Sequence, residues 1–109
     1  MNCFKLSVLL GLVSATTFAN AADIEKTIVI KGHRFEPSVI TIPAGQRIKL
    51  TVHNQDSTAE EFESHALRLE KVIAGGSKAV LMIRPLKPGR YKFVGEFNEE
   101  TAQGVIVAE

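Results

Sequence analysis

The fold is decided by one stretch near the end of the chain, Lys87-Pro88-Gly89-Arg90-Tyr91-Lys92-Phe93-Val94-Gly95-Glu96-Phe97-Asn98-Glu99-Glu100-Thr101-Ala102-Gln103-Gly104-Val105-Ile106-Val107. Pro88-Gly89 is typical of a turn, and the residues after it alternate polar and apolar as in a half-buried strand. Gly104 opens a run of β-branched residues that suits a second strand. The stretch therefore predicts a hairpin of two strands joined by an acidic loop.

The loop of this hairpin contains Glu96, Glu99 and Glu100. Like charges this close together repel one another, which raises the cost of ionising all of them at once. A cation among the carboxylates would remove that cost. The composition of the loop therefore favours a cation site, and the alternative is that its charges are simply solvated.

The first residues are typical of a secretory signal. Lys5 supplies positive charge, residues 6–13 supply an apolar segment, and Ala19-Asn20-Ala21 offers small residues for cleavage. The apolar segment is too short to span a bilayer. We therefore expect residues 1–21 to be a signal peptide and residues 22–109 to be one small domain, periplasmic or secreted.

Charge and cysteine content exclude several classes of function. The chain has 13 Lys and Arg against 12 Asp and Glu, so it has no broad basic surface for nucleic acid. The single cysteine, Cys3, would leave with the signal peptide, so the mature domain would form neither a disulfide nor a copper thiolate. No nucleophile with a base, no Gly-rich phosphate loop and no His-x-x-x-His metal motif supports a hydrolase or kinase.

The rest of the chain is a series of short apolar runs separated by turn signals. Residues 47–53 alternate polar and apolar throughout, which places Ile48, Leu50 and Val52 in the core. No segment has a sustained period near 3.6. The pattern predicts an all-β Greek-key sandwich of about seven strands. Within it we expect Met82 to fill core space.

The hairpin resembles the C-terminal hairpin of the cupredoxins, in which Pro-Gly-x-Tyr-x-Phe-x-Cys-x-x-His precedes a Gly and a final strand. Gly95 stands where the copper-binding Cys would be, and Asn98 stands where the His would be. Ala102 and Gln103 stand where the axial Met is expected. The resemblance implies a cupredoxin-like sandwich without the type 1 copper ligands. Tyr91 is at a position where Greek-key sandwiches often bury a ring, so we expect its hydroxyl to bind the backbone.

The segment 35–54 resembles the same family, because Phe-x-Pro, a strand, Pro-x-Gly, a strand and Asn follow in that order. The first His ligand usually comes six residues after that Asn, and here the position is Glu60. Because successive strand residues face opposite ways, Glu60 and Glu61 should point apart, whereas Glu63 should share a face with Glu61. His65 follows on the same strand as a reserve ligand.

The resemblance implies that three loops meet at one end of the sandwich and form a metal site. The predicted ligands are His33, Glu60, Glu61, Glu63, Glu96, Asn98 and Glu99. Carboxylate, amide and imidazole donors suit iron, manganese or Cu(II), and they suit Cu(I) poorly. A blue-copper site is not expected.

The motifs Glu-Glu-Phe-Glu-Ser, Gly-Glu-Phe and Thr-Ala-x-Gly resemble those of cupredoxin-like periplasmic proteins that accompany ferrous-iron permeases. This resemblance implies binding of iron or copper, possible ferroxidase activity, and delivery of iron to a membrane permease or a periplasmic iron-binding protein. Asn98 departs from relatives expected to carry His there.

Two other functions stay open at this point. One is a metal-free interaction domain whose acidic end docks a partner protein, and the other is a periplasmic copper carrier. The acidic residues near Glu60 could also be solvated charges that keep a strand edge from associating with another sheet.

Overall fold

The computed structural model describes residues 11–12 and 23–109, so the predicted signal peptide and its cleavage site lie outside the described residues, apart from residues 11 and 12. Residues 23–109 form nine strands and one 3₁₀ turn, η1. The elements are β1 (Ile24–Lys31), β2 (Arg34–Glu36), β3 (Val39–Ile42), β4 (Ile48–Asn54), β5 (Glu60–Ser64), β6 (Leu69–Ile73), β7 (Lys78–Ile83), β8 (Gly89–Gly95), η1 (Glu96–Asn98) and β9 (Gln103–Ala108).

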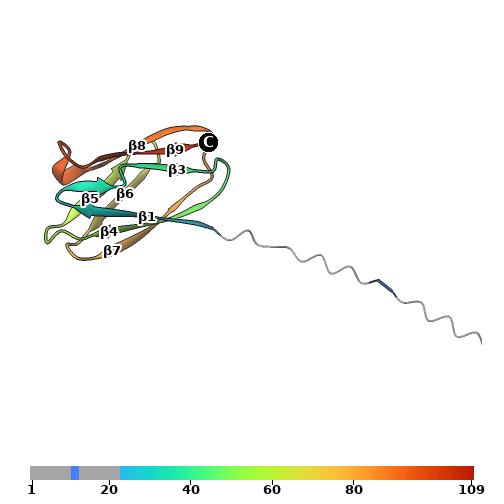
Figure 1. Cartoon of the computed structure of the whole chain (residues 1–109), viewed down its shortest axis with the longest axis horizontal. Coiled ribbons are helices and arrows are strands. Elements are labelled where there is room, and N and C mark those ends of the chain that lie inside the picture. The colour runs from blue at the N-terminus through green and yellow to red at the C-terminus, as the bar shows by residue number, and fades with distance from the viewer. Residues whose placement is uncertain (1–10, 13–22) are drawn as a thin grey trace, which may run out of the picture.

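The strands form two packed sheets, which confirms the all-β sandwich (Figure 1). One sheet has the order β2-β1-β4-β7, and the other has the order β3-β9-β8-β5-β6. The predicted hairpin is present as β8 and β9, which pair antiparallel. Two pairs, β1 with β4 and β3 with β9, are parallel. Their strands are joined by crossover connections rather than by hairpins.

The described part of the chain has nine strands rather than seven because two short segments that read as loops are strands. β2 pairs with the end of β1, and β6 folds back on β5. The chain reverses between β5 and β6 at Arg68, which adopts a φ of 54°. Ser64 Oγ supports the reversal, since it accepts a hydrogen bond from the Leu67 N–H at 3.1 Å.

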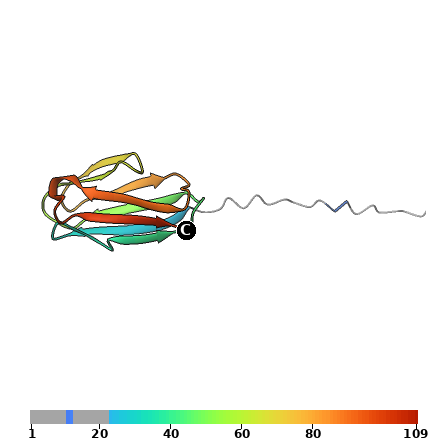
Figure 2. The same cartoon turned by 90° about the horizontal axis from the view of Figure 1, so that it is seen from above.

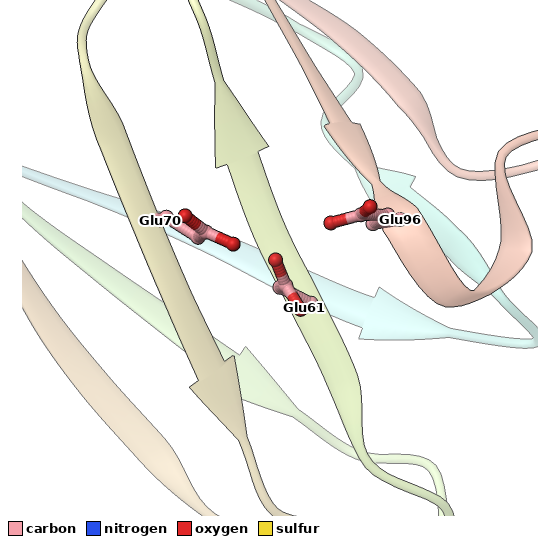
Figure 3. A group of neighbouring side chains, drawn as sticks. All are labelled: Glu61, Glu70 and Glu96. Carbon is pink, nitrogen blue, oxygen red and sulfur yellow. The ribbon is translucent and has the colours of Figure 1, made fainter.

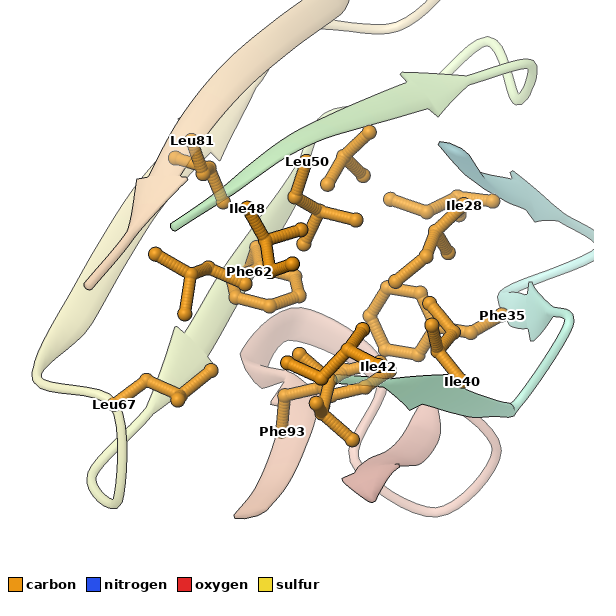
Figure 4. Close-up of a cluster of buried hydrophobic side chains, with 14 of the residues drawn as sticks. Ile28, Phe35, Ile40, Ile42, Ile48, Leu50, Phe62, Leu67, Leu81 and Phe93 are labelled. Atoms are coloured by element: carbon orange, nitrogen blue, oxygen red, sulfur yellow. The ribbon is translucent and has the colours of Figure 1, made fainter. Parts of the chain in front are cut away.

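The core lies between the sheets and is built on three aromatic rings, those of Phe35, Phe62 and Phe93 (Figure 4). Phe62 and Phe93 stack with ring centroids 5.1 Å apart, and Phe35 meets both edge-on. The predicted core residues of β4 are buried, since they are at most 1% exposed: Ile48, Leu50 and Val52. Burial of these side chains supplies the main stabilising term for a domain of this size.

Two further predictions have opposite outcomes. The Tyr91 hydroxyl donates to the Lys87 carbonyl at 2.7 Å, as expected, although the ring is only partly buried against the core. The prediction that Met82 fills the core is wrong, because its side chain is 43% exposed. The alternation of β7 turns Leu81 and Ile83 inward, which leaves Met82 on the outer side of an edge strand.

The turn η1 lies at the end of the sandwich away from the C-terminus (Figures 1 and 2). The β1–β2 turn, which carries His33, approaches the same end, since the Thr101 hydroxyl donates to the His33 carbonyl at 2.6 Å. Over the described part of the chain, no helix has the length and hydrophobicity needed to cross a membrane.

Candidate metal site

Carboxylates from three elements converge on the outer face of the larger sheet. Glu61 on β5, Glu70 on β6 and Glu96 at the start of η1 each bring a carboxylate oxygen within 4.8 Å of the others. Figure 3 shows the three side chains pointing toward one another. Glu63, two residues after Glu61, pairs in register with Glu70 across the β5–β6 hairpin. These four residues, Glu61, Glu63, Glu70 and Glu96, are called the acidic face below.

Glu61 is the central member of the acidic face. It is 9% exposed, and among the described residues its Oε1 atom is buried without a hydrogen-bond partner. The pKa of the Glu61 carboxyl is raised to about 8, because its protonated form is favoured by hydrogen bonding first with Glu70 and then with Glu96. A buried oxygen surrounded by other carboxylates is satisfied only by a proton or a cation.

Glu63 and Glu96 extend the same network. Hydrogen bonding with Glu96 raises the pKa of Glu63, and the same interaction lowers the pKa of Glu96. The opposite directions indicate that these carboxyls titrate together rather than independently. His65 Nε2 lies 3.2 Å from Glu63 Oε1, so an imidazole flanks the carboxylates.

Glu60 points the other way, into the sandwich, as the strand alternation predicted. It is 1% exposed. Its Oε1 accepts hydrogen bonds from the N–H groups of Glu61 at 3.0 Å and Phe97 at 2.9 Å. Its Oε2 accepts one from the Asn98 Nδ2 at 2.7 Å. This carboxylate is therefore satisfied by protein donors alone.

Gly95 leaves space for that carboxylate. A Cβ atom at position 95 would lie 2.6 Å from Glu60 Cδ and 2.6 Å from the Ala102 Cβ, which is closer than such atoms approach in proteins. Glu60 and Ala102 thus fill the volume that a side chain at position 95 would need.

The turn with His33 lies beside these groups and forms a separate hollow. Asp56 accepts hydrogen bonds from the Gly32 and His33 N–H groups at 2.8 and 2.9 Å, and the bond from His33 is the main cause that lowers the Asp56 pKa. These bonds hold His33 at a φ of 56°. Its Nε2 lies 3.4 Å from the Thr58 hydroxyl. His33 and Glu99 line an exposed hollow of about 440 Å³ beside η1.

The predicted ligands therefore occupy three places that share one region. Glu61, Glu63 and Glu96 are on the acidic face, Glu60 and Asn98 are bonded to each other inside the sandwich, and His33 and Glu99 are in the exposed hollow. Glu96 and Asn98 also reach the hollow. Metal binding by any of these residues stays a prediction.

Glu70 is a member of the acidic face that the sequence analysis missed. Its segment reads as a short excursion before the turn at Gly75-Gly76, and this pattern predicts no direction for the Glu70 side chain. A hairpin between residues 60–64 and 69–73 would have placed Glu70 opposite Glu63. Residues 70–72 are only a weak signal for that strand. All three are exposed, so they do not alternate between buried and exposed positions.

Comparison with known proteins agrees with the fold. The family model for the cupredoxin-like domain matches residues 4–108. An uncharacterized protein of Rickettsia prowazekii (strain Madrid E) is 43% identical over 84 residues, which cover 77% of this chain and 67% of the relative.

Two solved structures have the same sandwich. The metal-binding domain of the Cu(I)-exporting P-type ATPase CopA of Streptococcus pneumoniae D39 has a TM-score of 0.70 at 16% identity, covering 78% of this chain and 84% of that domain. Auracyanin A, a blue copper protein of Chloroflexus aurantiacus, has a TM-score of 0.69 at 15% identity, covering 81% and 100%. At these identities the likeness establishes the fold alone.

Proposed function

The chain belongs to the cupredoxin-like domain family, and on that basis we propose that it is an exported metal-binding protein whose acidic face takes up iron. Glu61, Glu63, Glu70 and Glu96 supply the carboxylate oxygens. His65, which contacts Glu63, supplies an imidazole at the rim. With the predicted signal peptide, the protein would act in the periplasm or outside the cell.

The observation that carries this proposal is the Oε1 atom of Glu61. Within the described residues it is buried and lacks a hydrogen-bond donor, and its neighbours are carboxylates from two other elements. Solvated surface charges have no such atom, because water satisfies them. A bound cation would satisfy Oε1 and remove the mutual repulsion of the acidic face.

The donor set favours iron in its ferric form. Anionic oxygen ligands stabilise the higher charge of Fe(III) more than that of Fe(II), which would also lower the iron reduction potential. The protein would then hold Fe(III) after oxidation of Fe(II) by dioxygen and pass the iron to a membrane permease or a periplasmic iron-binding protein. Cu(II) fits the same donors and is the second metal of the proposal.

A blue-copper centre forms no part of the proposal, since the residues do not fit one. The only cysteine of the chain is Cys3, which lies in the predicted signal peptide. Next to Gly95, the Glu60 carboxylate is already bonded to Asn98 and to two backbone N–H groups. Neither a thiolate nor space for one is available beside Gly95.

Metal binding is tested on protein purified without a histidine tag. We expect Glu61→Gln and Glu96→Gln each to weaken binding of Fe(III) or Cu(II) about tenfold or more, as measured by calorimetric titration. The two losses should be non-additive, because both residues serve one site. Glu25→Gln should bind as the native protein does, since Glu25 is on β1 with a side chain 74% exposed.

Small and additive losses would reject the metal site. Loss of Fe(II) under air, followed with and without added copper, then separates a ferroxidase from a protein that binds iron without oxidising it.

One observation favours a second function, docking of a partner protein. Phe97 is 53% exposed in a loop that also carries Glu96, Glu99 and Glu100. An exposed aromatic ring among acidic residues suits a partner with a basic rim around an apolar pocket. Retention of partner binding after Glu61→Gln and its loss after Phe97→Ala would support docking without metal.

A further inference from the structure

We infer that Glu60 is a positioning residue for the acidic face and not one of its ligands: its buried carboxylate holds η1 against β5 so that Glu96 faces Glu61. The metal-binding measurements that test this inference rest on the proposed function. Its geometry does not depend on a metal.

The first step concerns how η1 is attached. The ladder between β5 and β8 consists of two residue pairs, Phe62 with Gly95 and Glu63 with Val94. After Gly95 the chain leaves the sheet and enters η1. Within the described residues, two hydrogen bonds that involve a side chain join η1 to β5, and both end on the Glu60 carboxylate.

The second step concerns what this attachment fixes. One oxygen, Glu60 Oε1, accepts from the N–H of Glu61 and from the N–H of Phe97. The backbone beside Glu61 and the backbone beside Glu96 are therefore held to the same atom. Because Glu61 alternates to the outer face, its carboxylate meets Glu96 there. The inner carboxylate thus sets the separation of two residues of the acidic face.

The third step concerns charge and shape. All three groups around the Glu60 carboxylate are N–H donors. These donors require acceptor oxygens and do not require a metal ion. Removing the acceptors leaves these N–H groups without partners, which destabilises the arrangement that they hold. A glutamine keeps the shape and one carbonyl acceptor, and its amide can donate to Asn98 once the Asn98 amide turns over.

This chemistry gives a direct test with two substitutions. Glu60→Met removes the acceptors, and we expect binding of Fe(III) or Cu(II) to weaken about tenfold or more, as for other groups that orient ligands. Glu60→Gln keeps hydrogen bonds between residue 60 and η1, and we expect this variant to bind Fe(III) or Cu(II) with close to the native affinity. Glu100→Gln, an exposed charge in the same loop, is the matched control and should change little.

Background substitutions identify which ligand Glu60 positions. In a Glu96→Gln background, Glu60→Met should cause little further loss, because the residue it positions no longer contributes. In a Glu70→Gln background the loss should persist, since Glu70 is held by the β5–β6 ladder. Gly95→Ala should reproduce the effect of Glu60→Met, because the added Cβ displaces the Glu60 carboxylate.

Hydrogen exchange at the Phe97 amide provides a readout without metal. This amide should be protected in the native protein and in Glu60→Gln, and should exchange faster in Glu60→Met or Gly95→Ala. If Glu60→Met does not fold, the other two variants decide. A loss of binding in Glu60→Gln as large as that in Glu61→Gln would make Glu60 a ligand and overturn the inference. An unchanged Phe97 amide in Gly95→Ala would overturn it as well. Failure of Glu61→Gln to affect metal binding would reject the proposed function and leave the exchange test intact.

Discussion

Glu60 and Glu61 are adjacent and chemically identical, yet their surroundings give them opposite roles. Glu60 points inward to three N–H donors, which suit a carboxylate. Glu61 points outward to Glu70 and Glu96, which suit its protonated form or a cation. A one-residue difference in strand position decides between the two environments, because side chains alternate across a sheet.

The raised pKa of Glu61 predicts a pH dependence of stability without metal. Its carboxyl has a pKa of about 8 in the folded protein against 4.5 as the reference value, so the folded state holds the proton more tightly. That contribution to stability is fully present below the unfolded value and is lost as pH rises through about 8. The raised pKa of Glu63 acts in the same direction. The lowered pKa of Glu96 has the opposite sign. Its contribution to stability is present above the reference value and is lost as pH falls below that value.

We therefore expect the melting temperature of the metal-free protein to fall between about pH 5 and pH 9. Glu61→Gln should flatten that slope, because the amide does not titrate. Thermal unfolding followed by circular dichroism over this range measures the effect. An equal slope in the variant would assign the titration to other groups.

At the scale of elements, the β8–β9 hairpin was predictable and the β5–β6 hairpin was not. Pro88-Gly89 and the alternation after it are local signals that need no partner strand. β6 instead has three exposed residues in succession, Glu70, Lys71 and Val72, so its direction comes from pairing with β5. The acidic face was therefore predicted without Glu70, which the second hairpin contributes.

The packing of β9 on β8 predicts a sensitive position at Gly104. A Cβ at this position would lie 2.2 Å from the Phe93 Cζ, and the Phe93 ring is 1% exposed, so the ring could not move without disturbing the core. We expect Gly104→Ala to lower the free energy of unfolding by about 1–3 kcal/mol, the usual cost of overpacking. Val39→Ala on the adjacent β3, where the side chain is 54% exposed, should change it by less than about 0.5 kcal/mol. Chemical denaturation of both variants provides the comparison.

At the scale of the whole molecule, basic and acidic residues are nearly equal in number, but the acidic residues are unevenly distributed. The full chain has 13 basic and 12 acidic residues, yet Glu61, Glu70 and Glu96 meet within 4.8 Å. A domain without a disulfide among residues 23–109 relies on its core, so a bound ion that satisfies this cluster would add stability to the folded state.

We expect Fe(III) and Cu(II) to raise the melting temperature at neutral pH, and Mg²⁺ to raise it much less. Mg²⁺ keeps its waters and gains little from carboxylates crowded at one position or from imidazole. The double variant Glu61→Gln and Glu96→Gln should respond to none of the three ions. A full response in that variant, or none in the native protein, would count against the acidic face as the metal site.

The sequence alone determined the fold class, the core of β4 and the β8–β9 hairpin, because turn chemistry and two-residue alternation are local properties. It also determined that Glu60 and Glu61 face opposite ways. Only the tertiary structure decided that Glu60 is satisfied by Phe97 and Asn98. It likewise brought Glu70 to Glu61 and left Met82 exposed. These outcomes depend on which strands become neighbours and which become edges, and that choice is made by packing two whole sheets over one core rather than by any single segment.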